Sequence, residues 1–253
     1  MSEAPVAPGI DGPISVDLLT DPAGVPRARA MLQRAQWAAS AFARYDKAAV
    51  DRIVHAAAAA GAARASEYAD WAVRETGFGV AEHKVIKNLA GSTGLVEAYA
   101  AHDYVTPRAD PAARMVEIPR PAGVVLALTP STNPVATVFI KSLLALMTRN
   151  AVVVSPHPLA RECSAAAART LAAAAVAAGA PGGVIQVVDE PSVPLIHALM
   201  ADERTSLIVA TGGTAVVRAA YSSGTPAIGV GPGNVPVFVA DDADLSEAAR
   251  RIV

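Results

Sequence analysis

The chain has 253 residues, of which 53% are hydrophobic and 17% charged, so it can bury the core of a large domain and is not a disordered chain. Its net charge of -2 gives no general attraction for nucleic acid or an acidic membrane, and small soluble partners are the better expectation. The single cysteine, Cys163, excludes an internal disulfide and agrees with a reducing compartment such as the cytoplasm.

The first hundred residues show no catalytic cluster. Residues 1–19 lack the basic and apolar regions of a signal peptide and are read as an extended, partly ordered lead-in. From 27 to about 99 the sequence is rich in Ala, Arg and Glu, with an interruption at Gly77 and Gly79, which predicts two or three helices. No membrane span is expected, because the most apolar stretch, 164–178, owes its hydropathy to alanine.

Residues 103–119 have a different texture. Two runs typical of strands, 104–106 and 115–118, flank a segment with the prolines and aspartate of a turn. This pattern predicts a hairpin of the kind that forms an arm.

After Pro121, short apolar runs alternate with helical segments. The runs lie at 124–128, 151–154, 184–188, 206–209, 228 and 237–239. They are β-branched or rich in leucine, and Gly, Pro, Ser or Asn precedes the helical stretches, which predicts a doubly wound α/β domain with a parallel sheet buried on both faces. Ligands bind outside the carboxyl ends of such strands, so four loops become candidate sites.

The first loop precedes a helix predicted at 135–147. Its residues are Thr129, Pro130, Ser131, Thr132, Asn133 and Pro134. Proline suits the first helical turn and Asn133 suits the N-cap, where its side chain would accept from a free backbone amide. In the functional alternative, the Asn133 amide donates to the oxyanion of an acyl-transfer intermediate. The sequence leaves both interpretations open.

The second and third loops follow later strands. The second consists of Ser155, Pro156, His157 and Pro158. A lone histidine beside a helix start is more often a structural hydrogen bonder than a catalyst, and a cofactor contact is the alternative. In the third loop, Thr211, Gly212 and Gly213 precede a helix starting near Ala215, where a ligand can approach the backbone and the helix N-terminus favours a phosphate. The order is not G-x-G-x-x-G, so a plain turn stays open.

The fourth loop, 229–236, is unusually rich in glycine. Gly229, Gly231 and Gly233, bounded by prolines, indicate a loop in which side chains would obstruct something, and tight core packing is the alternative. The aspartates between 241 and 244 are read as a solvated connection, and the five histidines have no metal-ligand spacing, so no metal is predicted.

Several features occur in one order between about residues 119 and 244. They are R-P-A-G-V-V at 120–125, the T-P-S-T-N-P loop, R-N-A at 149–151 leading into S-P-H-P, G-A-P at 179–181, D-E-P-S at 189–192, the A-T-G-G turn and the glycine loop. As a set they closely resemble the CoA-acylating aldehyde dehydrogenases, including the aldehyde half of bifunctional aldehyde/alcohol dehydrogenases and the sulfoacetaldehyde enzymes. The resemblance is faint before residue 100.

The resemblance implies a Rossmann-like cofactor domain. Residues 1–102 would be its N-terminal helical part, 103–119 an oligomerisation arm and 120–253 the NAD-binding α/β part. Asn133 would help to form the oxyanion hole, the second loop would lie along the adenosine ribose, and the third near the adenosine and phosphates. The residues expected to contact the cofactor are Thr129, Pro130, Ser131, Thr132, Ser155, Pro156, His157, Pro158, Thr211, Gly212, Gly213, Gly229, Gly231 and Gly233. NAD is favoured over NADP, because no clear arginine for a 2'-phosphate stands beside the second loop.

The resemblance also implies transfer to CoA. In hydrolytic members the segment equivalent to 230–236 carries a glutamate that activates water, whereas here Val230 or its glycine neighbours take that place. A thioester without a nearby carboxylate base favours transfer to a thiol over hydrolysis. The expected reaction is thiolate attack on a short aldehyde, hydride transfer to NAD and thiol exchange with CoA, in a full-length enzyme expected to be a homo-oligomer.

The family's catalytic cysteine lies downstream of the glycine loop, in a separate catalytic domain. This sequence offers the predicted strand at 237–239 and a helix beginning with Asp244, and then ends at Val253, so we expect the nucleophile to be absent and the chain alone to be inactive. Cys163, at the head of an alanine-rich helix, is expected to be a structural thiol. The alternative is a catalytically inactive NAD-binding or subunit-interaction module derived from the same fold.

Overall fold

A five-stranded parallel sheet organises the computed structural model, which describes residues 24–233 and 236–252. Its strands are β3 (Val124–Leu128), β4 (Ala151–Ser155), β5 (Ile185–Val187), β6 (Thr205–Thr211) and β7 (Ala227–Val230). They lie in the order β5-β4-β3-β6-β7, and neighbouring strands are parallel. Every residue of β3 and β4 is buried, as unbroken apolar runs require when both faces of a sheet are covered. The predicted doubly wound fold class is confirmed.

The connecting helices make the sheet change direction between β3 and β6. They are α6 (Pro134–Met147), α7 (Arg161–Ala177) after the short 3-10 helix η1 (Pro158–Ala160), α8 (Val193–Ala201) and α9 (Thr214–Tyr221). Because such crossovers are right-handed, the strand order places α6 and α7 on one face of the sheet and α8 and α9 on the other. The ligand crevice of a doubly wound sheet is expected at this change of direction, outside the carboxyl ends of β3 and β6.

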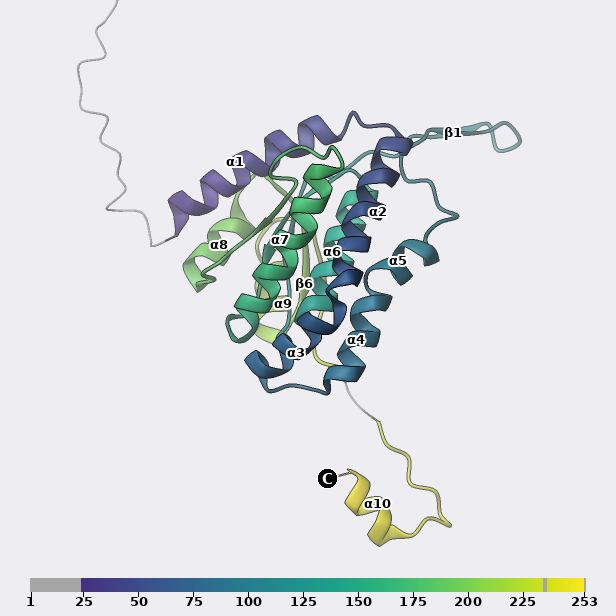
Figure 1. The fold of residues 1–253 in the computed structure, drawn as a ribbon, viewed down its shortest axis with the longest axis vertical. Helices are drawn as coiled ribbons and strands as arrows, with labels where there is room; N and C mark the ends of the chain where they lie inside the picture. Colours follow the sequence, from purple (N-terminus) through teal and green to yellow (C-terminus); the bar gives the residue numbers. More distant parts are fainter. Residues whose placement is uncertain (1–23, 234–235, 253) are drawn as a thin grey trace, which may run out of the picture.

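From residue 24 onward, five helices precede the sheet, where composition predicted two or three. They are α1 (Val25–Phe42), α2 (Lys47–Ala63), α3 (Ala65–Thr76), α4 (Ala81–Ala90) and α5 (Thr93–Ala98). Composition hides the break between α2 and α3, which is the single residue Arg64 in an otherwise alanine-rich run. The predicted interruption after α3 is present, with Gly77 in the left-handed region at φ 70°. In Figure 1, α1 lies beside α8 and α2 lies beside α7. These helices belong to the same hydrophobic core as the sheet.

An antiparallel hairpin projects from the body, formed by β1 (Arg108–Asp110) and β2 (Met115–Glu117) (Figure 1). The prediction of a first strand at 104–106 was wrong by a few residues. The Asp103 carboxylate accepts from the backbone N–H groups of Val105 and Thr106 at 2.8 and 2.9 Å, which holds these residues in a turn.

The predicted strand at 237–239 is also wrong. No strand partner pairs with these residues in the described part of the chain, and Phe238 is 92% exposed. Strand propensity alone does not form a strand without a neighbour to share its hydrogen bonds. The segment instead leads away from the body to α10 (Leu245–Ile252) (Figure 1). The predicted helix start is confirmed, because the Asp244 carboxylate accepts from the N–H groups of Ser246 and Glu247.

Two predictions fall partly or wholly outside the described residues. The lead-in at 1–19 lies outside them, and so do Asn234 and Val235 of the glycine loop. Within the described ranges, no helix is long and apolar enough to cross a membrane.

Candidate functional site

All four candidate loops begin at one edge of the sheet, where the parallel strands end. Leu128 at the end of β3 pairs with Ser155 of β4 and with Ala210 of β6, and Thr211 pairs with Val230 of β7. The edge is also joined beyond the strands. Thr129 N–H donates to the Ser155 carbonyl at 3.1 Å, and Gly212 N–H donates to the Val230 carbonyl at 3.2 Å. The loops that the sequence singled out are therefore neighbours.

Two hydroxyl groups at this edge are buried without a partner. Thr129 and Ser155 are 4% and 2% exposed, and their side-chain oxygens have no hydrogen bond within the described residues. They are two of five such side-chain atoms in the described ranges. Leaving a buried hydroxyl unsatisfied costs about 1–3 kcal/mol. Hydroxyls of this kind beside the change of strand direction fit a polar ligand that would complete their hydrogen bonds.

The helices that start at this edge differ in how their N-termini are occupied. The Glu75 carboxylate at the end of α3 accepts from the N–H groups of Glu162 and Cys163, both at 2.8 Å, and so closes the start of α7. Ser192 caps α8 through the N–H of Leu195. At both starts, side-chain oxygens therefore occupy backbone amides that an anion would otherwise use.

The start of α9 is open. Its N-cap is Gly213, which has no side chain to accept from the first amides of the helix. A β-carbon at Gly213 would meet nothing within 4 Å, and one at Gly212 would meet only Val216, at 3.6 Å. Free backbone N–H groups at a helix N-terminus bind phosphate well. These residues therefore fit the pyrophosphate of a dinucleotide.

The Ser155–Pro158 turn gives its histidine a structural hydrogen bond. His157 precedes η1, and its Nδ1 accepts from the N–H of Leu159 at 3.1 Å. This bond fixes the imidazole beside the helix start, as the commoner role of such a histidine suggests. A cofactor contact by this turn stays a prediction.

Asn133 occupies the N-cap of α6, but its side chain does not cap the helix. The capping prediction is wrong in this respect, because a long-range partner takes the amide oxygen. The ammonium group of Lys87, on α4, donates to Asn133 Oδ1 at 3.0 Å. One turn earlier, Lys84 donates to the carbonyl of Thr132 at 2.7 Å. The Asn133 Nδ2 hydrogens have no partner in the described parts of the chain, so they can donate to a ligand oxygen.

Lys141 is a buried lysine that the sequence reading missed. Its residue is 8% exposed, and its Nζ donates to the carbonyls of Leu128 and Val209 at 2.6 and 2.8 Å. Leu128 is the last residue of β3, and Val209 lies two residues before the end of β6, so the amine ties the two strands together where the sheet changes direction. Burial lowers the pKa of Lys141 to about 7. The sequence did contain a signal for this residue, because it is a lone lysine among the apolar residues of a helix predicted for the core.

The glycine loop divides into a packed glycine and open ones. A β-carbon at Gly229 would lie 2.7 Å from Val217 Cγ1 and 2.9 Å from the ring of Tyr221, whose hydroxyl accepts from Gly229 N–H. Tight packing therefore explains Gly229. At Gly231 and Gly233 a β-carbon would meet nothing within 4 Å, so these positions are open in the way that a ligand-facing loop requires.

Cys163 does not have the environment of a nucleophile. It is fully buried on α7, and burial, followed by hydrogen bonding to Glu75, raises the pKa of its thiol to about 12. A buried thiol that resists ionisation is a poor nucleophile. In the described ranges no group of three or more His, Cys, Asp or Glu side chains could hold a metal ion.

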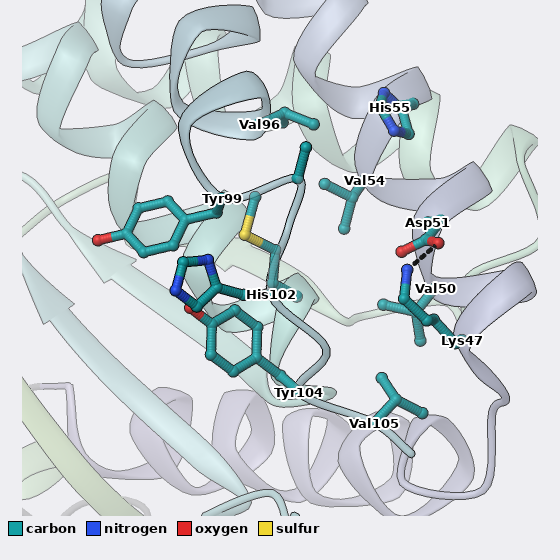
Figure 2. A pocket seen from close by; sticks show the side chains of 12 residues that line it. Lys47, Val50, Asp51, Val54, His55, Val96, Tyr99, His102, Tyr104 and Val105 are labelled. Atoms are coloured by element: carbon teal, nitrogen blue, oxygen red, sulfur yellow. Dashed lines mark hydrogen bonds and ion pairs between the residues drawn. The ribbon is translucent and has the colours of Figure 1, made fainter.

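A hollow of about 90 Å³ lies elsewhere on the molecule, between α2 and the segment after α5. Figure 2 shows Tyr99, His102 and Tyr104 on one side of it and the ion pair of Lys47 and Asp51 on the other. Met147, the last residue of α6, also lines it. Because α6 starts at the carboxyl edge of the sheet, its last residue marks the opposite edge, and the hollow is separate from the four loops.

Comparison with known proteins agrees with this geometry. The aldehyde dehydrogenase family model matches residues 20–253. The bifunctional aldehyde-alcohol dehydrogenase AdhE of Escherichia coli is 41% identical over 230 residues, which are 90% of this chain and 26% of that protein. The acylating sulfoacetaldehyde dehydrogenase of Cupriavidus necator is 39% identical over 226 residues, which are 88% of this chain and 46% of that protein.

A solved structure shares the fold closely. The acetylating aldehyde dehydrogenase of Geobacillus thermoglucosidasius aligns with a TM-score of 0.83 at 41% identity, covering 90% of this chain and 50% of that one. This chain thus spans half or less of the length of these relatives. The resemblance to acylating enzymes that the motifs indicated is confirmed, and the chain belongs to the aldehyde dehydrogenase family.

Proposed function

We propose that this chain is the cofactor-binding part of a CoA-acylating aldehyde dehydrogenase, which converts a short aldehyde, NAD+ and CoA to an acyl-CoA, NADH and a proton. The open start of α9, beside the unpartnered hydroxyls of Thr129 and Ser155, is the observation that carries the proposal. Relatives named as acetylating or acylating support the reaction class.

The proposed cofactor path crosses the carboxyl edge of the sheet. The amides around Gly212 and Gly213 would hold the pyrophosphate, and the Ser155–Pro158 turn would lie along the adenosine ribose. The loop at 129–132 and the open glycines of the fourth loop would border the rest of the cofactor. When bound, the nicotinamide supplies the hydride acceptor of the reaction.

Asn133 is proposed as the oxyanion donor. Its Nδ2 has no partner within residues 24–233 and 236–252, while its oxygen is taken by Lys87, so the amide presents a donor rather than an acceptor. The sequence has no Asp or Glu between 229 and 240, so this stretch offers no carboxylate to activate water. The absence of a carboxylate base favours transfer of an acyl group to a thiol such as CoA over hydrolysis.

The nucleophilic cysteine is proposed to come from outside this chain, because Cys163 is buried and its thiol resists ionisation. A related propionaldehyde dehydrogenase of Rhodopseudomonas palustris, 32% identical, has been solved with bound CoA and an acylated cysteine. By this proposal the chain alone binds cofactor and does not oxidise aldehyde.

Three further assignments are part of the proposal. NAD is proposed over NADP because the Ser155–Pro158 turn contains no arginine for a 2'-phosphate, although a related engineered glycolyl-CoA reductase has been solved with NADP+. The range 103–119 is proposed as a homo-oligomerisation arm, because Met115, Val116 and Ile118 expose apolar side chains on or beside its hairpin. The cytoplasm is proposed as the compartment, on the single cysteine.

Calorimetric titration with NAD tests the proposal. We expect saturable binding to the wild-type chain, and a loss of at least about tenfold in affinity for Gly212→Val, because a branched side chain would fill the space that the phosphate needs. Gly182→Val is the matched control, since a β-carbon there meets nothing within 4 Å, in the loop before β5. Absence of binding by the folded wild type at millimolar NAD, or equal affinity in both variants, would overturn the cofactor assignment.

A further inference from the structure

Two lysines of α4 contact consecutive residues of the first loop. Lys84 donates to the Thr132 carbonyl at 2.7 Å, and Lys87 donates to Asn133 Oδ1 at 3.0 Å. Lys84 and Lys87 are three residues apart and lie on the same side of their helix. Burial of Lys84 disfavours its charged form, and the neighbouring positive charge of Lys87 disfavours it further. Both effects, burial first, lower the pKa of Lys84. The two ammonium groups thus contact the first loop at an electrostatic cost to α4.

The helix that carries these lysines is firmly anchored. Asn88, 2% exposed, donates its side-chain amide to the Ala65 carbonyl at the start of α3. Ser92 donates back to the Asn88 carbonyl at 2.7 Å. The base of the Lys87 side chain therefore has a fixed position relative to α3.

The contact of Lys87 with Asn133 determines which end of the side-chain amide faces α4. An asparagine side chain has one accepting end, Oδ1, and one donating end, Nδ2. An ammonium group only donates, so it attracts Oδ1 and repels Nδ2. With Oδ1 held by Lys87, Nδ2 is turned away from α4, and withdrawal of charge through the amide strengthens its N–H groups as donors.

The contact with Lys87 also takes the place of the hydrogen bond that Asn133 would usually make as an N-cap residue. An N-cap asparagine ordinarily turns its oxygen toward the second or third amide of its own helix. In α6 that bond is not made, while Thr137 bonds to the Asn133 carbonyl through both its N–H and its hydroxyl. Lys87 thus competes with the helix for the same oxygen.

We infer that Lys87 is a positioning residue that orients the Asn133 amide so that Nδ2 faces the reacting oxygen of an acyl-transfer intermediate. The inference rests on the proposed function of Asn133 as an oxyanion donor. Lys87 itself touches neither substrate nor cofactor in this assignment, and it acts only through Asn133.

The first arm of the test uses the chain as it is and needs no activity. Side-chain amide signals in a ¹⁵N NMR spectrum are assigned to Asn133 by their loss in Asn133→Ala. In Lys87→Met we expect these signals to shift, with NAD affinity within about twofold of wild type. Lys87→Arg should restore the wild-type signals. Unchanged Asn133 signals in a folded Lys87→Met would overturn the inference.

The second arm measures kcat in an active enzyme that contains this chain. Lys87→Met should lower kcat about tenfold in the wild-type background and less than about twofold in the Asn133→Ala background, because the lysine has no target once the amide is gone. Equal losses in the two backgrounds would refute action through Asn133. Lys47→Met is the control, since it removes one lysine from an ion pair on α2 that does not contact the loop. Full kcat in Asn133→Ala alone would instead refute the oxyanion proposal, while the NMR arm would still decide the orientation by Lys87.

Discussion

The buried amine of Lys141 predicts an unusual dependence of stability on pH. In the folded chain its pKa is about 7, because burial disfavours the charged form, whereas an unfolded lysine has a pKa of about 10.4. Between these values the unfolded chain binds one proton more than the folded chain. The contribution of Lys141 to the free energy of unfolding therefore rises as the pH increases from about 7 toward about 10.4. This contribution is lost as the pH falls back to about 7.

The geometry agrees with a neutral amine. A neutral amine has two hydrogens, and Lys141 has two acceptors, the carbonyls of Leu128 and Val209. A third hydrogen would have no acceptor among the described residues. Protonation thus adds a buried charge and an unsatisfied donor together.

The variant Lys141→Met isolates this effect, because methionine has a similar length and no titrating group. Between pH 7.5 and 9.5 we expect the unfolding free energy of the wild type to gain about 1.4 kcal/mol per pH unit over the variant. Urea unfolding followed by circular dichroism at four pH values measures both chains, and their difference cancels the titration of all other groups. A difference that stays flat across this range, or that falls with pH, would refute a neutral Lys141.

Three shorter predictions follow from the same site. In an active enzyme containing this chain, Asn133→Ala should lower kcat by about two to three orders of magnitude with NAD affinity retained, and equal losses in both would contradict an oxyanion role. Gly229→Ala should lower the free energy of unfolding by about 1–3 kcal/mol, because its β-carbon would overlap Val217 and Tyr221; an unchanged urea midpoint would show that the loop relaxes at no cost. The Cys163 thiol should react with a chromogenic disulfide at pH 8 only after urea unfolding, and rapid reaction of the folded chain would contradict its burial.

The sheet was predictable because its strands are short, continuous and rich in β-branched residues. The predicted run at 124–128 coincides with β3, and the run at 151–154 lacks only the last residue of β4. Burial on both faces selects such runs whatever their neighbours are. Parallel strands also end at one edge, so the sequence indicated which loops would meet before any contact was visible.

The wrong predictions have the opposite cause. They concern segments whose structure depends on particular distant or local partners. The run at 237–239 resembles a strand and finds no neighbour to pair with in the described chain. The run at 104–106 resembles a strand, but the carboxylate of Asp103 binds its backbone first. The break at Arg64 interrupts a composition that is helical on both sides.

The candidate site shows the same division. Its loops could be read from the sequence, but their partners could not, because Lys87 lies 46 residues before Asn133 and Glu75 lies 87 residues before Glu162. Nothing in the local pattern of α3 or α4 marks these side chains as partners of a loop beside the sheet. Lys141 differs, because a lysine in the middle of an apolar helix predicted for the core was a signal in itself.

These long-range partners divide the carboxyl edge into places of different chemistry. Glu75 puts a carboxylate on the start of α7, which repels a second anion there. Lys87 holds the amide at the start of α6, so that place offers an oriented donor. The N-terminus of α9 differs from those of α6, α7 and α8. Among the described residues, its first backbone N–H groups have no side-chain cap, and no side-chain amide is held beside them. A dinucleotide with its phosphates at α9 and its reactive end toward Asn133 would therefore cross from β6 to β3, over the point where Lys141 joins the two strands and the sheet changes direction.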